Sequence, residues 1–203
     1  MAVPRRPIGV DGDDDGDEVA EFFEDDGDVL PDLDRDSPPH LRALADAAHR
    51  GDVEALRLAI DGHSGSIDDP VEDGDALLHL SCLYGHLPCV QLLLQRGANL
   101  EIRDEEGAIP LHDASAGGFT EIVQLILDAV GNPDSINRML NTVDAEGDTP
   151  LHHAARGEHL NVIQLLLATG ASPKKTNIYG KIPAELADPG TEARRFLESA
   201  NDG

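Results

Sequence analysis

The pattern of hydrophobic and polar residues changes near residue 39. From there onward, short apolar segments alternate with turns rich in glycine and aspartate. Three of these segments, 90–94, 123–127 and 163–167, share one pattern: a β-branched residue, a glutamine and three aliphatic residues. A short helix that is apolar on more than one face must pack against neighbours on more than one side. The pattern therefore predicts a series of short stacked helices after residue 39.

A second recurring segment precedes each of these runs. Its fullest form is Gly-Asp-Thr-Pro-Leu-His at 147–152, and related copies begin at Gly74, Gly107 and Gly180. From Gly74 onward, successive first glycines are 33, 40 and 33 residues apart. A degenerate copy occupies about residues 44–60. A repeated period of this length predicts an array of about five similar units.

The period of 33 residues, the Thr-Pro-Leu-His motif, the glycine in mid-unit and the leucine-rich run resemble the ankyrin repeat. In character the chain is similar to small stand-alone ankyrin-repeat proteins of plants. The resemblance implies an all-α solenoid of helix pairs with projecting turn fingers. Because no unit can bury its own apolar face, the units should stack, with the end units acting as caps. We place the repeat domain at 39–200, with units at about 40–73, 74–106, 107–146, 147–179 and 180–200.

Individual residues support this interpretation. Pro150 suits the first turn of a helix and Thr149 suits the preceding N-cap position. Gly85 and Gly118 stand at the turn between the helices of a pair, where a positive φ is expected. Glu158 occupies the corresponding place in the fourth unit, which predicts a shifted or strained turn there.

Two further segments depart from the regular unit. Residues 130–139 add about seven residues to the third unit, and we expect them to form a loop that helps to distinguish a partner. Residues 191–199 read as a short final helix, with Phe196 and Leu197 facing inward.

Charge adds a second part to this picture. The chain carries a formal charge of −25, and residues 1–38 contribute 14 acidic and three basic residues, or −11. With few apolar residues, this segment is expected to be a disordered acidic tail. The acidic surplus disfavours nucleic acid and anionic membranes and favours a basic protein partner.

The expected location of the chain follows from what the sequence lacks. Two cysteines are too few for a disulfide framework. No secretory signal is visible, and no apolar run approaches the roughly 18–20 residues of a membrane helix. We expect a protein of the cytoplasm or the nucleus that does not insert into a membrane, and a monomer because both ends of the array look capped.

The tail holds one apolar feature, the pair Phe22 and Phe23 within a run of acid. One interpretation is a solvated tail whose charge keeps the chain soluble. The other is a short linear motif with the phenylalanines as anchor. The segment resembles the two-phenylalanine acidic motif that recruits proteins to an endoplasmic-reticulum receptor, although Asp25 and Gly27 depart from that motif.

Two patterns could suggest chemistry. His79, Cys82, His86 and Cys89 have spacings that resemble a zinc site. Each also has a place in the repeat, and the two helices should direct the side chains to different layers, so we expect no metal. His79, His112 and His152 are expected to tie each helix start to the neighbouring turn rather than to act in acid–base catalysis. We expect no catalytic residue and no cofactor.

The remaining hypothesis is binding. By resemblance, a partner would lie along the fingers and the concave face of the first helices. Exposed aromatic and arginine side chains are the best candidates for anchors. The full set of candidates is Tyr84, Arg103, Tyr179, Arg156, Asp113, His153, Ile102, Phe22 and Phe23. The expected function is a non-catalytic adaptor for another protein; the alternative is an acidic chaperone for a basic client such as a ribosomal protein or histone.

Overall fold

A computed structural model describes residues 39–72 and 74–201, and the structural statements below concern those residues. The acidic tail expected at 1–38, with Phe22 and Phe23, lies outside the described residues.

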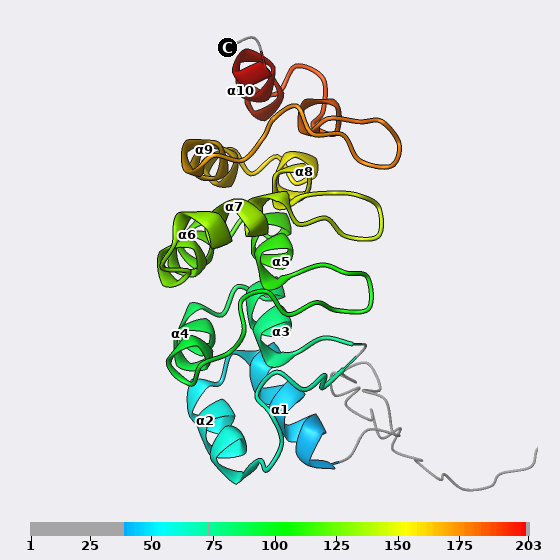
Figure 1. Cartoon of the computed structure of the whole chain (residues 1–203). Helices are drawn as coiled ribbons and strands as arrows, with labels where there is room; N and C mark the ends of the chain where they lie inside the picture. The colour runs from blue at the N-terminus through cyan, green and yellow to red at the C-terminus, as the bar shows by residue number, and fades with distance from the viewer. Residues whose placement is uncertain (1–38, 73, 202–203) are drawn as a thin grey trace, which may run out of the picture. The chain divides into compact units, whose positions relative to one another are not determined.

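The described residues form ten α-helices and one short 3-10 helix, which confirms the all-α fold. In chain order they are α1 (Pro39–Arg50), α2 (Val53–Gly62), α3 (Leu77–Leu83), α4 (Leu87–Gln95), α5 (Pro110–Ala116), α6 (Thr120–Ala129), α7 (Pro133–Asn141), α8 (Pro150–Arg156), α9 (Leu160–Thr169), η1 (Pro183–Glu185) and α10 (Glu192–Asn201). The helices α1, α3, α5 and α8 lie in one row and α2, α4, α6 and α9 in a second (Figure 1). Each pair thus contributes one helix to each row, as a solenoid requires.

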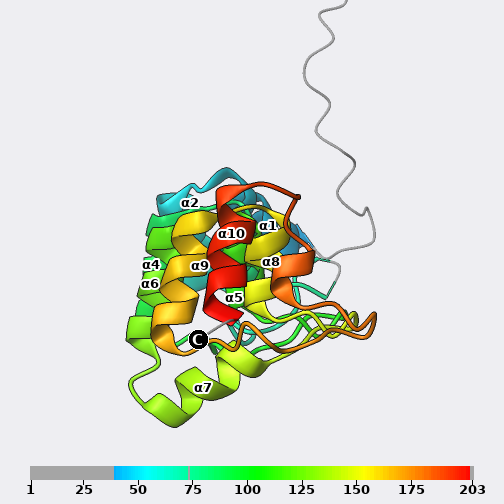
Figure 2. The same ribbon diagram turned by 90° about the horizontal axis from the view of Figure 1, so that it is seen from above.

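The turns between successive pairs project as fingers from the first row, on the side away from the second row (Figures 1 and 2). An aspartate closes each of two fingers: Asp104 Oδ1 accepts the Ala108 N–H at 2.8 Å, and Asp144 Oδ1 accepts the Asp148 N–H at 2.8 Å. Asn177 Oδ1 accepts the Tyr179 and Lys181 N–H groups in the last finger. A side-chain oxygen that holds its own turn in this way fixes the finger without help from a partner.

Neighbouring fingers are also joined by their backbones. The Ala145 N–H donates to the Glu106 carbonyl at 2.7 Å, and the Ile178 N–H donates to the Glu146 carbonyl at 3.0 Å. These bonds link the three fingers that contain Glu106, Glu146 and Ile178 into one continuous surface.

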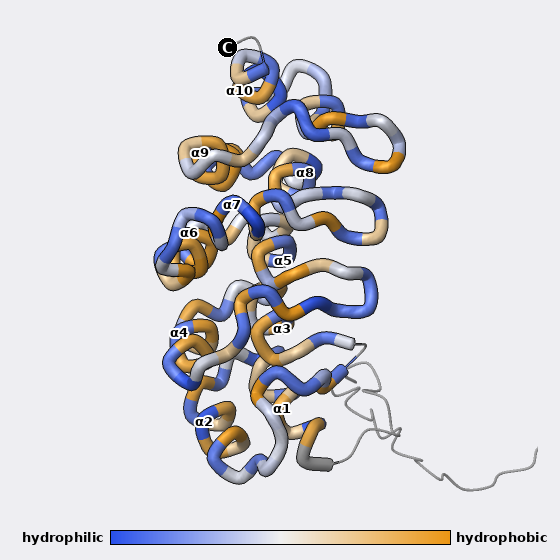
Figure 3. Tube along the Cα trace, viewed as in Figure 1, coloured by the Kyte–Doolittle hydropathy of each residue, from blue (hydrophilic) through white to orange (hydrophobic). Residues whose placement is uncertain are grey.

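The core runs between the two rows of helices. Small residues such as Ala114 and Ala154 are fully buried in the first row, and aliphatic residues such as Val123 and Ile163 are fully buried in the second. In Figure 3 hydrophobic residues gather on the helices, whereas the finger between α4 and α5 is largely hydrophilic. Alanine keeps the first helices thin, so that neighbouring units approach closely.

The histidines of the repeat motif connect the units. His112 Nδ1 accepts the Ile109 N–H at 3.0 Å, and its Nε2–H donates to the Asp148 carbonyl of the next unit at 3.2 Å. His152 does the same with the Thr149 N–H and the Lys181 carbonyl. His79 likewise accepts the Ala76 N–H and donates to the Ala108 carbonyl. The histidines therefore have the structural role that the sequence predicts, each as a neutral ring with the proton on Nε2.

The turn within each pair needs a positive φ. Gly85 and Gly118 both have φ of 74°, as predicted. Glu158 keeps the same register with φ of 60°, and it is the one non-glycine residue with positive φ among the described residues. Its carboxylate accepts the Asp188 N–H at 2.7 Å, a hydrogen bond that glycine could not make. The fourth turn is strained rather than shifted.

Two expectations were wrong. Residues 130–139 do not form a simple loop, because most of them belong to α7. Asn132 caps this helix by accepting the Ser135 N–H, and Met139 is fully buried. In α10, Leu197 is fully buried, but Phe196 is 37% exposed, because neighbouring residues on a helix point about 100° apart and only one can face the core.

The inserted helix α7 is attached on both sides. Arg138 holds the carboxylate of Glu101, at the base of the preceding finger, with two hydrogen bonds of 2.6 and 2.7 Å. Lys175, at the base of the following finger, donates to the Asn141 carbonyl at 2.7 Å. The helix thus contacts the unit before it and the unit after it.

Candidate functional site

The fingers and the first helices together form what we call the finger-side face. Both tyrosines of the chain are exposed there: Tyr84 is 48% and Tyr179 is 64% exposed. A tyrosine offers a large apolar ring and a hydrogen-bonding hydroxyl, and such residues are frequent anchors in protein interfaces.

Tyr84 follows the C-terminal end of α3 and stands in a small aromatic group. Its ring lies 4.8 Å from the ring of His49 and is stacked 6.3 Å from that of His86. His86 Nε2 is bonded to the His49 carbonyl at 2.8 Å, which fixes this group at the junction of the first two units. The ring of Tyr84 is therefore held in place while one of its sides remains open.

Tyr179 lies at the tip of the last finger beside Ile178, which is 66% exposed. Asn177 and the neighbouring finger hold the backbone of both residues in place. Two large exposed side chains on a fixed turn form a small apolar patch, and such a patch is a candidate for contact with another protein.

Arg103 and Ile102 lie in the finger between α4 and α5. The Arg103 guanidinium donates to the carbonyls of Gly107 and Val143, at 2.6 and 3.2 Å, and so joins its own finger to the next. Ile102 is only partly exposed. This pair shapes the finger-side face, and Arg103 already has a structural task there.

His153 and Arg156 belong to a polar network on α8. His153 Nε2 is bonded to Asp144 Oδ2 at 2.7 Å, and Arg156 pairs with the fully buried Asp148. Asn177 donates to the other oxygen of Asp148 at 2.8 Å. Burial is the largest single influence on the pKa of Asp144 and raises it, but the hydrogen bonds from His153 and the Asp148 N–H, together with the charges of His153 and His112, outweigh burial and lower that pKa.

Within the described residues, this network also contains the one group of three potential ligand residues close enough to share a metal ion: Asp144, Asp148 and His153, with ligand atoms within 4.8 Å of one another. Arg156 and Asn177 already satisfy Asp148 with an ion pair and a hydrogen bond. A guanidinium in that position repels a cation, so the network is explained as a structural one.

The zinc-like pattern does not assemble. The Nε2 of His79 points to the following unit, at Ala108, whereas the Nε2 of His86 points to the preceding unit, at His49. Cys82 and Cys89 are buried free thiols, and burial raises the pKa of both. Side chains that face opposite neighbours cannot bind the same ion.

Asp113, on α5, has quite different surroundings. Together with Asp75, Asp104, Glu105 and Glu106 it lines a cavity of about 450 Å³, which we call the acidic pocket. The buried Oδ2 atom of Asp113 has no hydrogen-bond partner among the described residues. Burial, followed by the charges of Asp75 and Asp104, raises the pKa of Asp113 well above its usual value.

The position of Asp113 on the first helix makes it a candidate in the sequence, but the sequence does not predict the pocket. The other four carboxylates come from neighbouring fingers, and their convergence depends on the stacking of units. The sequence signal for the pocket was the acidic run Asp104-Glu105-Glu106 together with another acid, Asp113, at a motif position of the following helix. Only the fold places the two opposite each other.

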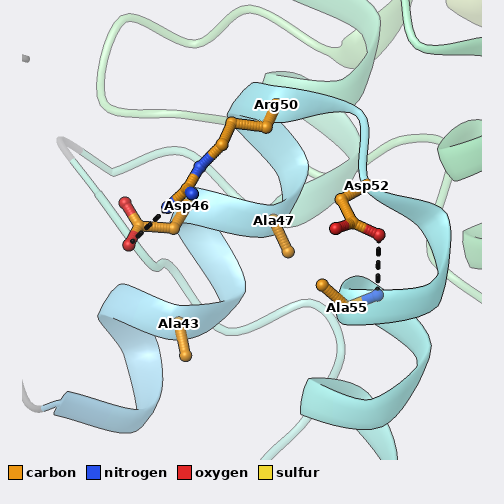
Figure 4. Close-up of a pocket in the computed structure, with 6 residues that line it drawn as sticks. All are labelled: Ala43, Asp46, Ala47, Arg50, Asp52 and Ala55. Atoms are coloured by element: carbon orange, nitrogen blue, oxygen red, sulfur yellow. Dashed lines mark hydrogen bonds and ion pairs between the residues drawn. The ribbon is translucent and has the colours of Figure 1, made fainter. Parts of the chain in front are cut away.

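A second hollow lies between α1 and α2 (Figure 4). Its charged residues serve the helices themselves: Arg50 pairs with Asp46 at 3.2 Å, and Asp52 caps α2 by accepting the Ala55 N–H at 2.9 Å. This hollow is therefore accounted for by helix capping and a surface ion pair. In the described part of the chain, no helix combines the length and the apolar character needed to cross a membrane.

Comparison with known proteins defines the class. The family profile described as ankyrin repeats (three copies) matches residues 44–139 and 96–177. These matches cover more than half of the chain, and the chain belongs to the ankyrin-repeat family.

Individual relatives share parts of this array. The chain is 35% identical over 99 residues to protein phosphatase 1 regulatory subunit 27 of Mus musculus, an alignment of 49% of this chain and 64% of that protein. It is 37% identical over 73 residues to Rabankyrin-5 of Homo sapiens, covering 36% of this chain and 6% of that protein. It is 34% identical over 82 residues to protein phosphatase 1 regulatory subunit 12A of Mus musculus, covering 39% of this chain and 8% of that protein.

The alignments span just under two thirds of the first of these relatives and small parts of the others. The family and these relatives identify the repeat domain as a module for interaction with other proteins. Relatives named as regulatory subunits also favour a non-catalytic protein.

Proposed function

We propose that the repeat domain is a non-catalytic adaptor that holds one protein partner against the finger-side face. The observation that carries this proposal is the exposure of both tyrosines of the chain, Tyr84 and Tyr179, on that face. The ring of Tyr84 packs against His49 and His86, and a hydrogen bond holds the backbone of Tyr179, so part of the conformational entropy of binding is already lost in the free chain. Affinity would come from these anchors, and selectivity from the charged finger residues between them.

The relatives suggest where to look for the partner. Two of them are named as regulatory subunits of protein phosphatase 1. A protein phosphatase is therefore one candidate to test, alongside partners found without prior assumption.

The test is quantitative affinity purification with the full chain as bait. A double variant, Tyr84→Ala with Tyr179→Ala, should lose a partner that the native chain captures. The matched control is Leu58→Ala, which removes another exposed apolar side chain, 72% exposed, on α2 in the second row of helices. Equal capture by the double variant, or loss only with the control, would contradict an interface on the finger-side face.

A second candidate function is an acidic chaperone for a basic client. It is favoured by charge: residues 39–203 keep −14 when the −11 of residues 1–38 is subtracted from the total of −25. Binding through such a field weakens steeply with ionic strength, because salt screens charges beyond about 8–10 Å. A complex that survives both moderate salt and removal of residues 1–38 argues against the chaperone and leaves the adaptor.

We also propose that the protein works as a monomer in the cytoplasm or nucleus. Two buried free thiols, Cys82 and Cys89, suit a reducing compartment. Sedimentation of the full chain tests the first statement and microscopy of the tagged chain tests the second; a stable dimer or a secreted product would contradict them.

A further inference from the structure

The acidic pocket differs from the other polar clusters described above, because all of the described residues that line it are carboxylates. Its lining is Asp75, Asp104, Glu105, Glu106 and Asp113. The charged groups that act on Asp113 are Asp75, Asp104 and Glu106, all acidic. The nearby guanidinium of Arg103 is engaged by the carbonyls of Gly107 and Val143.

The fourth unit shows what the third unit lacks. There, the finger aspartate Asp144 faces His153 and binds it at 2.7 Å. Around the first helix of the third unit, α5, Asp104 of the preceding finger takes the place of Asp144 and Asp113 takes the place of His153, so an acid faces an acid. The position of Arg156 is taken by Ala116, and α5 contains no lysine or arginine. The same architecture that supplies its own cation in one unit leaves it out in the other.

The second observation is the state of Asp113 itself. Its Oδ2 atom is shielded from solvent and accepts no hydrogen bond within the described residues. A buried carboxylate oxygen without a partner costs stability, and it recovers that loss when a donor arrives. Asp113 lines the cavity, so a small rotation of its side chain would present this oxygen to a donor that enters the pocket.

The dimensions favour an organic cation over a metal ion. No three carboxylates of the pocket come close enough to share one ion, because the only described group that does so is Asp144, Asp148 and His153. A cavity of about 450 Å³ is also far larger than a single ion requires, whereas it accommodates a long side chain with a charged end. An arginine or lysine can place its apolar stem against the finger and its donors among several carboxylates.

We propose that the acidic pocket receives an arginine or lysine side chain of the protein partner, with Asp113 as the innermost acceptor. This inference rests on the proposed adaptor function and names the chemistry of one contact: a basic anchor that enters between the finger of α4–α5 and the start of α5. The raised pKa of Asp113 fits this picture, because burial and the surrounding acids make its charged form costly and an entering cation would offset that cost.

The experiment uses the full chain and three blocked pentapeptides with a central arginine, lysine or citrulline between glycines. Amide resonances are followed by NMR at low salt. The two basic peptides should shift the resonances of residue 75, residues 104–106 and residue 113, and the citrulline peptide should not. Asp113→Asn should weaken binding by about tenfold, since it removes the charge that the cation faces in the pocket.

The matched control is Asp128→Asn, on α6 in the second row, where the same loss of charge falls on an exposed residue. This variant should bind the basic peptides like the native chain. Shifts that spread evenly over the acidic surface, binding that Asp113→Asn leaves unchanged, or calcium chloride alone producing the same shifts would each overturn the proposal.

The outcome separates this inference from the proposed function. If the basic peptides enter the pocket but partner capture does not depend on Tyr84 and Tyr179, the adaptor interface is wrong and the pocket chemistry stands. If capture depends on the tyrosines but the peptides ignore Asp113, the adaptor stands and the basic anchor is wrong.

Discussion

Asp113 offers the most direct test of how charge is distributed in the repeat domain. Asparagine has nearly the same shape as aspartate but no charge, and its amide can donate to a neighbouring carboxylate such as Asp104. The substitution Asp113→Asn removes a buried oxygen that has no hydrogen-bond partner and that stands among other acids. We therefore expect the variant to be more stable than the native chain.

The size of the effect follows from the surroundings. A buried, unsatisfied polar group costs about 1–3 kcal/mol, and more when it is charged. Some of that cost remains, because asparagine must also find partners, so we expect a net gain of about 1–2 kcal/mol at neutral pH. For a domain of this length each kcal/mol raises Tm by roughly 2–4 °C.

The stability difference between the Asp113→Asn variant and the native chain should depend on pH. Folding raises the pKa of Asp113 well above the value of about 3.9 that an unfolded aspartate has. The penalty is absent below the unfolded value, where aspartate is protonated in both states, and it grows as pH rises toward the folded-state pKa. The advantage of asparagine should therefore be small near pH 4 and larger near neutral pH.

The assay is urea unfolding followed by circular dichroism at both pH values, with Asp128→Asn as control. A variant that is less stable than the native chain at neutral pH would refute the reasoning. So would a difference that is the same at both pH values, because it would not come from the charge. A gain in stability together with a loss of peptide binding would mark Asp113 as a residue kept for binding.

Three further predictions concern the architecture. Lowering the pH from about 7 to about 4 should cost about 3 kcal/mol of folding stability through His112. Burial, and then the neighbouring His153, lower the pKa of His112 to about 4, so that only the unfolded ring takes up a proton as pH falls below about 6.5. Urea unfolding of the Asp113→Asn variant measures this stability, and a flat pH profile would contradict the expectation. Gly97→Ala should cost about 1 kcal/mol because its φ is positive and its surroundings are open, whereas Gly118→Ala should cost clearly more because its methyl group also meets the ring of His159; equal losses in thermal unfolding would show that the contact does not matter. Arg138→Ala should lower the stability only slightly, since its ion pair is exposed, and the loss should shrink in high salt; a salt-independent loss would point to packing instead.

The general fold could be predicted because each unit repeats the same local solution. Position and residue type agreed in several copies, so the roles of the motif histidines and of Gly85 and Gly118 followed from the sequence. A repeated pattern lets one copy correct the reading of another, as at Glu158, where the register was set by its neighbours and only the choice between strain and shift needed the structure.

The inserted helix α7 was missed although its signals were present. Asn132 followed by Pro133 is a typical helix start, but the segment has no counterpart in the other units with which to compare it. Phe196 was misplaced for a related reason: α10 stands at the end of the array, where neither a repeat nor a following unit defines which side is inward.

For the candidate site, the sequence predicted which side chains are exposed but not which contacts they make. Sequence position selected Tyr84 and Tyr179 as exposed, and they are. It could not show that Arg103 and Arg156 already bind within the protein, or that five acids meet around one cavity. Those properties depend on which side chains face each other across units, which a single repeat does not encode.

Helix α7 has a consequence for how the array yields to force or heat. In a stack where each unit touches only its neighbours, units can open one after another from an end. Here Arg138 and Asn141 fasten the inserted helix to Glu101 before it and Lys175 after it. These additional contacts strengthen both interfaces of the third unit, and we expect the three middle units to unfold together, as a single block between two end units that unfold more easily.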